Sequence, residues 1–180
     1  NPQTAQDLST LGGKILRMNL DGSIPDDNPF PDSYVYSYGH RNPQGITWTS
    51  DGTIFASEHG QSANDEINKI EAGQNYGWPS IEGEQTQEGF ISPLFTSGSE
   101  HTWAPSGMAF FNNKLYVAAL RGTAVLEFDL QTKEVKEIVN NMGRIRDVWI
   151  EDHTLYWITN NTDGRGTPGE KDDQLYKLEL

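Results

Sequence analysis

Short runs in which apolar and polar residues alternate recur along the whole chain, separated by glycine, proline and turn-forming residue pairs. Alternation with a period of two is typical of half-buried antiparallel strands. Patterns with the helical period are nearly absent. The runs that we expect to form strands are 14–19, 34–38, 46–49, 53–57, 66–70, 108–111, 114–119, 124–130, 147–150, 154–159 and 174–180. The pattern therefore predicts an all-β protein.

The expected strands repeat as a unit of strand, turn, strand, loop and strand. The turns fall at Asp51-Gly52, Asn112-Asn113 and Asp152-His153, in keeping with hairpins. Units at periods of about 40–50 residues favour a β-propeller, in which each unit is one blade, and a β-sandwich is the alternative. We place the units at about 40–75, 100–136 and 142–180, with a leading half-blade at 12–38.

The number of units is too small for a closed ring. Propellers typically close with four to eight blades, and residues 1–180 provide about three. Each blade buries its faces only against its neighbours, so the outer faces of the terminal units would be exposed. The chain is therefore expected to be a partial β-propeller that belongs to a larger ring.

Acidic residues outnumber basic ones: the chain has 26 Asp and Glu, 13 Lys and Arg, and a formal net charge of −13. This balance argues against nucleic acid or an anionic membrane surface as a partner, because both require clustered Lys or Arg. No apolar run is long enough for a membrane-spanning helix. The chain has no cysteine, which excludes disulfides, thiolate metal sites and cysteine nucleophiles.

Four of the six arginines fall in loops at corresponding ends of the units. They are Arg41 before the first strand of unit one, Arg121 after the second strand of unit two, and Arg144 and Arg146 at the start of unit three. In an up-and-down blade these positions lie on one face, so the four guanidinium groups would converge. Their mutual repulsion favours an anionic ligand there, and a polycarboxylate matches the bidentate geometry of arginine. The alternative is that each arginine pairs with a nearby carboxylate.

A second candidate site combines acidic residues with a glycine-containing turn. Asp65 and Glu66 are followed by Asn-Tyr-Gly-Trp-Pro at 75–79. Carboxylate and carbonyl oxygens are the ligands of Ca²⁺, although these residues alone are also explained by a solvated turn. The four histidines show no helical metal-ligand spacing, and no hydrolase elbow, phosphate loop or dinucleotide fingerprint occurs.

Seven stretches of the chain carry a resemblance to a known family. They are 13–25, 39–45, 57–60, 65–68, 75–79, 104–107 and 144–148. In this order they resemble the soluble quinoprotein glucose/aldose sugar dehydrogenases (glucose/sorbosone dehydrogenase-like), six-bladed propellers that use pyrroloquinoline quinone (PQQ) and calcium. The chain is similar to the C-terminal half of a family member, so the resemblance implies part of an oxidoreductase that oxidises aldoses at C1 with hydride transfer to PQQ.

The resemblance implies a role for each arginine of the cluster. Arg41 and Asn42 are similar to the pair that contacts the quinone, with Arg41 assisting the hydride chemistry. Arg121 stands where the glucose enzymes carry a lysine, which keeps the positive charge and changes its geometry. Arg144 and Arg146 are similar to the residues that bind the carboxylates of the cofactor.

The resemblance also implies two calcium positions and one missing group. Gly60 and Gln61 fall where backbone carbonyls hold the Ca²⁺ of the cofactor, although the glucose enzymes usually have proline at the second position. Glu66 and the carbonyl of Tyr76 resemble ligands of a Ca²⁺ found in aldose-type members. The general-base histidine of the family belongs to the N-terminal half, and no histidine of this chain matches its motif.

The expected partners are an aldose, an electron acceptor, and either the missing N-terminal half or a second copy of the chain. The resemblance places the protein outside the cytoplasm, periplasmic or secreted. Two other functions stay open: a non-catalytic ligand-binding propeller, and a half-propeller that closes by dimerisation. The sequence does not identify the sugar, because part of the sugar site would lie in the absent half.

Overall fold

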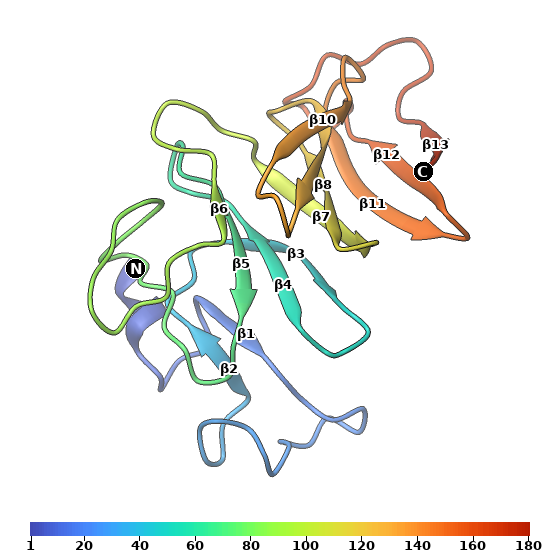
Figure 1. Cartoon of the computed structure of the whole chain (residues 1–180). Coiled ribbons are helices and arrows are strands. Elements are labelled where there is room, and N and C mark those ends of the chain that lie inside the picture. The colour runs from blue at the N-terminus through green and yellow to red at the C-terminus, as the bar shows by residue number, and fades with distance from the viewer.

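The computed structural model describes residues 1–180 and consists almost entirely of antiparallel β-sheet (Figure 1). The prediction of an all-β fold is confirmed. Its single helix is the short 3-10 helix η1 (Pro2–Gln6). The structure contains no helix that is long and apolar enough to span a membrane.

Four sheets follow one another along the chain. The first pairs β1 (Lys14–Leu16) with β2 (Val35–Tyr38). The second contains β3 (Pro43–Trp48), β4 (Ile54–Glu58), β5 (Glu66–Ile70) and β6 (Phe95–Thr96). The third contains β7 (Pro105–Phe111), β8 (Lys114–Ala119), β9 (Ala124–Asp129) and β10 (Val135–Val139). The fourth contains β11 (Ile145–Glu151), β12 (Thr154–Thr159) and β13 (Leu175–Glu179).

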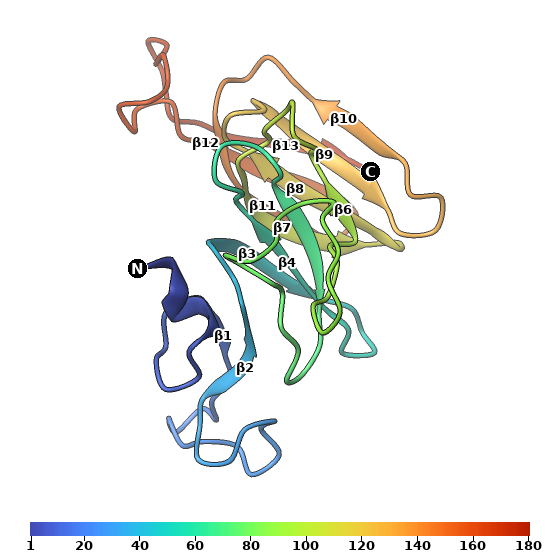
Figure 2. The same cartoon turned by 90° about the vertical axis from the view of Figure 1, so that its left-hand side faces the viewer.

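The three larger sheets are arranged as consecutive propeller blades (Figures 1 and 2). Their first strands, β3, β7 and β11, lie next to one another, and the other strands follow outward in chain order. Glycines permit this close approach: a Cβ on Gly45 would lie 2.2 Å from the carbonyl oxygen of Ser106, and one on Gly107 would lie 1.7 Å from Oδ1 of Asp147. The sheets form an open part of a ring, as the number of units predicts.

The hydrophobic core lies in two layers between the blades, and β8 contributes to both. Leu115 and Val117 face the second sheet, whereas Tyr116 and Ala118 face the fourth. All four side chains are buried. Because successive side chains of a strand point to opposite faces, a strand between two sheets is apolar at nearly every position, and the run from Leu115 to Leu120 has this pattern.

Two strands lie outside the expected strand runs. β6 is only two residues long, too short to produce an alternating pattern. β10 reads Val-Lys-Glu-Ile-Val and is the outer strand of its sheet, where charged side chains are tolerated because they face water. As a result two of the blades have four strands. β6 lies beyond the end of the unit expected at 40–75, and β10 continues past residue 136, the expected end of the next unit.

One face of the last sheet has no neighbouring blade. Trp149, Ile158 and Leu175 lie on this face and are 42%, 39% and 57% exposed. Trp149 stacks on Tyr156, with ring centroids 4.8 Å apart. An exposed apolar face of this kind is expected where a further blade would pack.

Candidate active site

The three larger sheets carry the predicted arginines at one common end. At this end the first strand of each sheet begins and the second strand ends, and the register pairs are Pro43 with Glu58, Pro105 with Ala119 and Ile145 with Thr159. The arginines flank these pairs: Arg41 precedes β3, Arg121 follows β8, Arg144 precedes β11 and Arg146 is its second residue. The antiparallel register therefore brings the four residues to the same edge of the blades.

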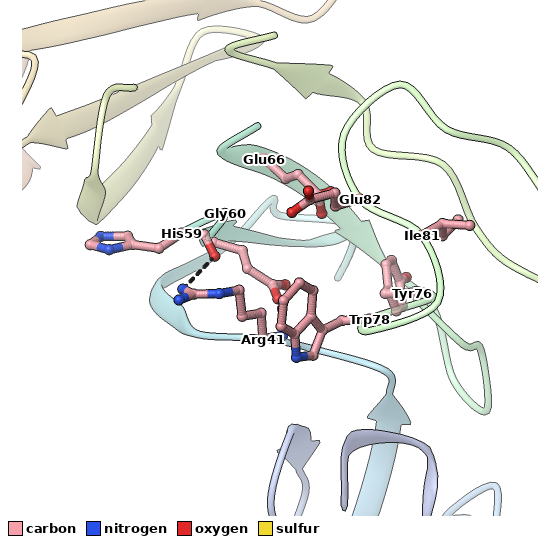
Figure 3. Close-up of a pocket in the computed structure, with 9 residues that line it drawn as sticks. Arg41, His59, Gly60, Glu66, Tyr76, Trp78, Ile81 and Glu82 are labelled. Carbon is pink, nitrogen blue, oxygen red and sulfur yellow. Dashed lines mark hydrogen bonds between the residues drawn. The ribbon is translucent and has the colours of Figure 1, made fainter. Parts of the chain in front are cut away.

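Arg41 is held by contacts that leave its charge without an acidic partner. Its guanidinium lies over the ring of Trp78, 5.4 Å from the centroid, and Nη1 donates to the carbonyl oxygen of His59 at 3.2 Å (Figure 3). The cation–π contact and the carbonyl together fix the direction of the side chain. Asn42, the next residue, is half-buried. Trp78 was not distinguished by the sequence pattern.

Arg146 lies near Arg41, and His59 lies close to both. Nε2 of His59 is 2.7 Å from the carbonyl oxygen of Pro105, and Nη1 of Arg146 donates to Oγ of Ser106 at 3.4 Å. Burial lowers the pKa of His59 below its usual value, and the charges of Arg41 and Arg146 lower it further. A neutral His59 adds no positive charge between the two arginines.

Arg121 and Arg144 share an open hollow with a third arginine. The hollow has a volume of about 280 Å³ and is also lined by Arg165 and the threonines Thr123 and Thr167. Arg165 lies in the Asp-Gly-Arg-Gly sequence at 163–166, which the sequence pattern did not single out. Three arginines around one hollow provide the kind of donors that suit an anionic group.

Ion pairing explains only one arginine of the predicted cluster. Nη2 of Arg144 pairs with Oδ2 of Asp163 at 2.9 Å, and Nε donates to the same oxygen at 2.9 Å. Arg41, Arg121 and Arg146 form no ion pair with any acidic side chain, and the remaining arginine pair in the chain joins Arg17 to Asp27. The alternative of local carboxylate partners therefore holds for Arg144 alone.

Beside Arg41, a small enclosed cavity collects acidic side chains (Figure 3). Glu58, Glu66 and Glu82 line it, and the space inside admits about one water-sized sphere, with a volume of about 10 Å³. Oε1 of Glu66 accepts from the backbone of Gly83 at 2.8 Å, and Oε2 accepts from Nδ2 of Asn68 at 3.0 Å. Burial, followed by the negative charge of Glu58, raises the pKa of Glu66 to about 7.

One unpaired oxygen at this cavity matches the chemistry of a hard cation. Oε2 of Glu82, which lines the cavity, is buried without a hydrogen-bond partner. Carboxylate, amide and carbonyl oxygens are ligands of Ca²⁺. No group of three or more His, Asp or Glu side chains is arranged to hold a metal ion. A cation here would therefore depend on backbone carbonyls and water for part of its coordination.

The predicted metal ligands do not all lie at this cavity. Gly60 and Tyr76 line it together with Glu66. Gln61 is exposed and lies outside it, next to Gly60 on the loop after β4. Glu82, which the sequence pattern did not single out, completes the acidic lining. The structure thus brings Gly60, Glu66 and Tyr76 together and leaves Gln61 at the surface.

An open propeller with unpaired arginines at one end, next to an acidic cavity, has the arrangement expected of propellers that bind a ligand with the loops at one end of the blades. Comparison with known proteins defines the class further. The model of the glucose/sorbosone dehydrogenase family matches residues 1–175, and the chain belongs to this family. The family resemblance carried by the sequence motifs is confirmed.

Three known proteins illustrate the similarity. Aldose sugar dehydrogenase YliI of Escherichia coli K12 is 37% identical over 193 residues, covering 89% of this chain and 52% of its own. Quinoprotein glucose dehydrogenase B of Acinetobacter calcoaceticus is 49% identical over 97 residues, covering 52% of this chain and 20% of its own. The PQQ-bound structure of aldose sugar dehydrogenase from Streptomyces coelicolor has a TM-score of 0.94 at 40% identity, covering 99% of this chain and 55% of its own.

The match in fold to the Streptomyces structure extends over almost the whole chain, which confirms the partial propeller. The chain spans about half the length, or less, of the curated relatives that it matches. A chain of about half the length of these relatives is expected to form only part of the ring, and the structure is an open part of a ring.

Proposed function

We propose that this chain forms the cofactor-binding part of a PQQ-dependent dehydrogenase that oxidises aldoses at C1. One observation carries the proposal: three arginines without acidic partners lie at one end of a chain whose net charge is −13. PQQ is a tricarboxylate, so its charge and shape suit clustered guanidinium groups. The similar Streptomyces protein, whose structure is described as PQQ-bound, supports the same cofactor.

In this proposal the arginines divide into two roles. Arg144 and Arg146 bind the carboxylates of PQQ, with Arg121 as an additional cation at the hollow that it shares with Arg144. When bound, PQQ supplies the acceptor for the hydride that leaves C1 of the sugar. Arg41, fixed by Trp78, donates hydrogen bonds toward the quinone and stabilises negative charge on its oxygen, and Asn42 contributes a further polar contact.

In this proposal none of the four histidines of the chain accepts the hydroxyl proton of the sugar. His40 is fully buried, and His59 is bonded to the carbonyl oxygen of Pro105. His153 packs edge-on against Phe111 in a hairpin turn, and His101 is exposed in a loop. The general base is therefore assigned to the N-terminal half, as the family resemblance implies. The exposed face of Trp149, Ile158 and Leu175 suits packing against that half, and a second copy of the chain is the competing partner.

The experiment that tests the proposal is a steady-state assay of the complete protein with glucose and xylose. PQQ, Ca²⁺ and a dye that accepts electrons are supplied. Oxidation is expected only when PQQ and Ca²⁺ are both present. Residues 1–180 alone are expected to give no rate above background because they lack the base. Turnover by residues 1–180 alone would contradict the assignment of the base, and no turnover by the complete protein would contradict the proposed activity.

The acidic cavity is proposed to hold a Ca²⁺ ion through Glu66, Glu82 and the carbonyl of Tyr76. The carbonyls of Gly60 and Gln61 are assigned to the Ca²⁺ that accompanies PQQ. Both Ca²⁺ positions rest on the family resemblance. The same resemblance is the basis for proposing an electron acceptor and a periplasmic or secreted location. The orphaned oxygen of Glu82 is the independent support for a cation at the cavity.

Substitution Glu66→Gln is expected to weaken Ca²⁺ binding to the PQQ-free complete protein by at least about tenfold, because a charged ligand becomes a neutral amide. Isothermal titration calorimetry measures this directly. Glu71→Gln is the matched control, since Glu71 is an exposed residue that pairs with Lys69. Equal Ca²⁺ affinity in Glu66→Gln and the unsubstituted protein would contradict a cation at this cavity.

A further inference from the structure

A chain of three buried polar side chains ends at the carboxyl group of Glu58. Oγ of Ser37 lies 2.8 Å from Nε2 of His40, and Nδ1 of His40 lies 2.9 Å from Oε2 of Glu58. Ser37 and His40 are 0% exposed and Glu58 is 4% exposed. The ring of His40 stacks on Tyr76, with centroids 4.6 Å apart.

The order serine, histidine, acid is that of a hydrolase triad, but this one is closed to substrates. A nucleophilic serine must be reachable by a carbonyl carbon, and Ser37 has no accessible surface. The Ser37–His40–Glu58 network therefore acts on the groups that it holds in place and not on a substrate.

The second oxygen of Glu58 holds the segment that carries the predicted quinone contacts. Oε1 accepts the backbone N–H of Arg41 and, at 3.3 Å, that of Asn42. The next residue, Pro43, is the register partner of Glu58 and has no N–H to donate to the sheet. At this end of β3 the side chain of Glu58 thus supplies the acceptor that orders the backbone before the first strand.

Three of the four groups around Glu58 can only donate, and the fourth, Nδ1 of His40, donates in the tautomer that carries its proton there. Besides the two backbone N–H groups and Nδ1 of His40, Nδ2 of Asn68 lies 3.4 Å from Oε2. An ionised carboxylate is an acceptor only, so it satisfies this set with His40 donating from Nδ1. An isosteric amide would place an NH₂ group against a donor and leave a buried N–H unsatisfied.

We propose that Glu58 is the positioning residue of the quinone site: it fixes the backbone of Arg41 and Asn42 so that their side chains meet the cofactor. The inference rests on the proposed function and extends it to a residue that does not itself touch the quinone. His40, which is itself bonded to Ser37, holds the other oxygen of the carboxyl group. Because the site is ordered before binding, PQQ does not have to order this segment, which favours affinity.

The test measures PQQ affinity in the complete protein by absorbance titration in the presence of Ca²⁺. Glu58→Gln is expected to raise the Kd for PQQ by about tenfold or more. It is also expected to lower kcat at saturating PQQ while the KM for the sugar stays within about twofold. The matched control is Glu127→Gln, since Glu127 on β9 is also largely buried and pairs with Lys114 at 2.7 Å. This control is expected to bind PQQ like the unsubstituted protein.

The outcomes separate positioning from folding and from the proposed function. Glu58→Asp keeps the charge but is one methylene too short, so it is expected to fold and still to bind PQQ more weakly. Thermal unfolding identifies variants that are only destabilised. An unchanged Kd in a folded Glu58→Gln or Glu58→Asp variant would overturn the positioning role. Failure of the unsubstituted protein to bind PQQ would instead overturn the proposed function.

Discussion

Arg41→Ala is expected to lower kcat for aldose oxidation in the complete protein by about 100- to 1,000-fold, the usual loss when one fixed donor to a developing negative charge is removed. The guanidinium of Arg41 is half-buried, held over Trp78 and bonded to the carbonyl of His59, and it has no carboxylate partner. Its charge is therefore available to the quinone. Stopped-flow absorbance at saturating PQQ measures the reduction step.

Two variants serve as references for the Arg41 result. Arg17→Ala removes a partly exposed arginine that pairs with Asp27 in the segment between β1 and β2, and its kcat is expected to stay within about twofold. Arg41→Lys keeps the charge and loses the planar fork, so an intermediate rate is expected. An effect of Arg41→Ala confined to the KM for the sugar would contradict a role at the quinone.

Combined substitution of Arg144 and Arg146 by glutamine is expected to weaken PQQ binding by about 100- to 10,000-fold. Each hydrogen bond to a charged group contributes about 1.5–3 kcal/mol, and about 1.4 kcal/mol corresponds to a tenfold change in Kd. Within the chain Arg146 has only a 3.4 Å contact with Ser106, so little intramolecular interaction is lost with it. Absorbance titration with PQQ gives the Kd.

The two single variants are expected to differ because of Asp163. Loss of Arg144 leaves Asp163 without its paired cation, whereas loss of Arg146 leaves no unpaired acid. Arg144→Gln should therefore weaken PQQ binding more than Arg146→Gln does, and Asp163→Asn should recover part of the difference. A double variant that binds PQQ as tightly as the unsubstituted protein would rule out the carboxylate contacts.

The fold could be predicted because it depends on local patterns. The hairpin at Asn112-Asn113 requires positive φ at both residues, and the structure has φ values of 47° and 62° there. Asparagine tolerates this conformation better than most residues, so the pair identifies the turn in the sequence. The continuous apolar run of β8 then marks a strand that is buried on both faces. β6 and β10 carry no such signal, because one is too short and the other is a charged outer strand.

The candidate site could be predicted where it depends on strand ends. Arg41, Arg121, Arg144 and Arg146 each stand at a predictable boundary, and antiparallel pairing brings those boundaries together. Trp78, Glu82 and Asp163 could not be predicted in the same way, because they come from loops whose path is set by tertiary contacts. Glu58 ends a strand as an ordinary polar residue would, and only the structure shows its four hydrogen-bonding neighbours.

The central claim is that this chain provides the PQQ site of a sugar dehydrogenase, and a single-turnover titration tests it most directly. The complete protein is titrated with PQQ in the presence of Ca²⁺, and an aldose is then added without an electron acceptor while the quinone absorbance is followed. We expect saturable binding of one PQQ per protein and sugar-dependent reduction of the bound quinone. Tight binding without reduction would identify a non-catalytic ligand-binding propeller, and absence of binding would contradict the claim.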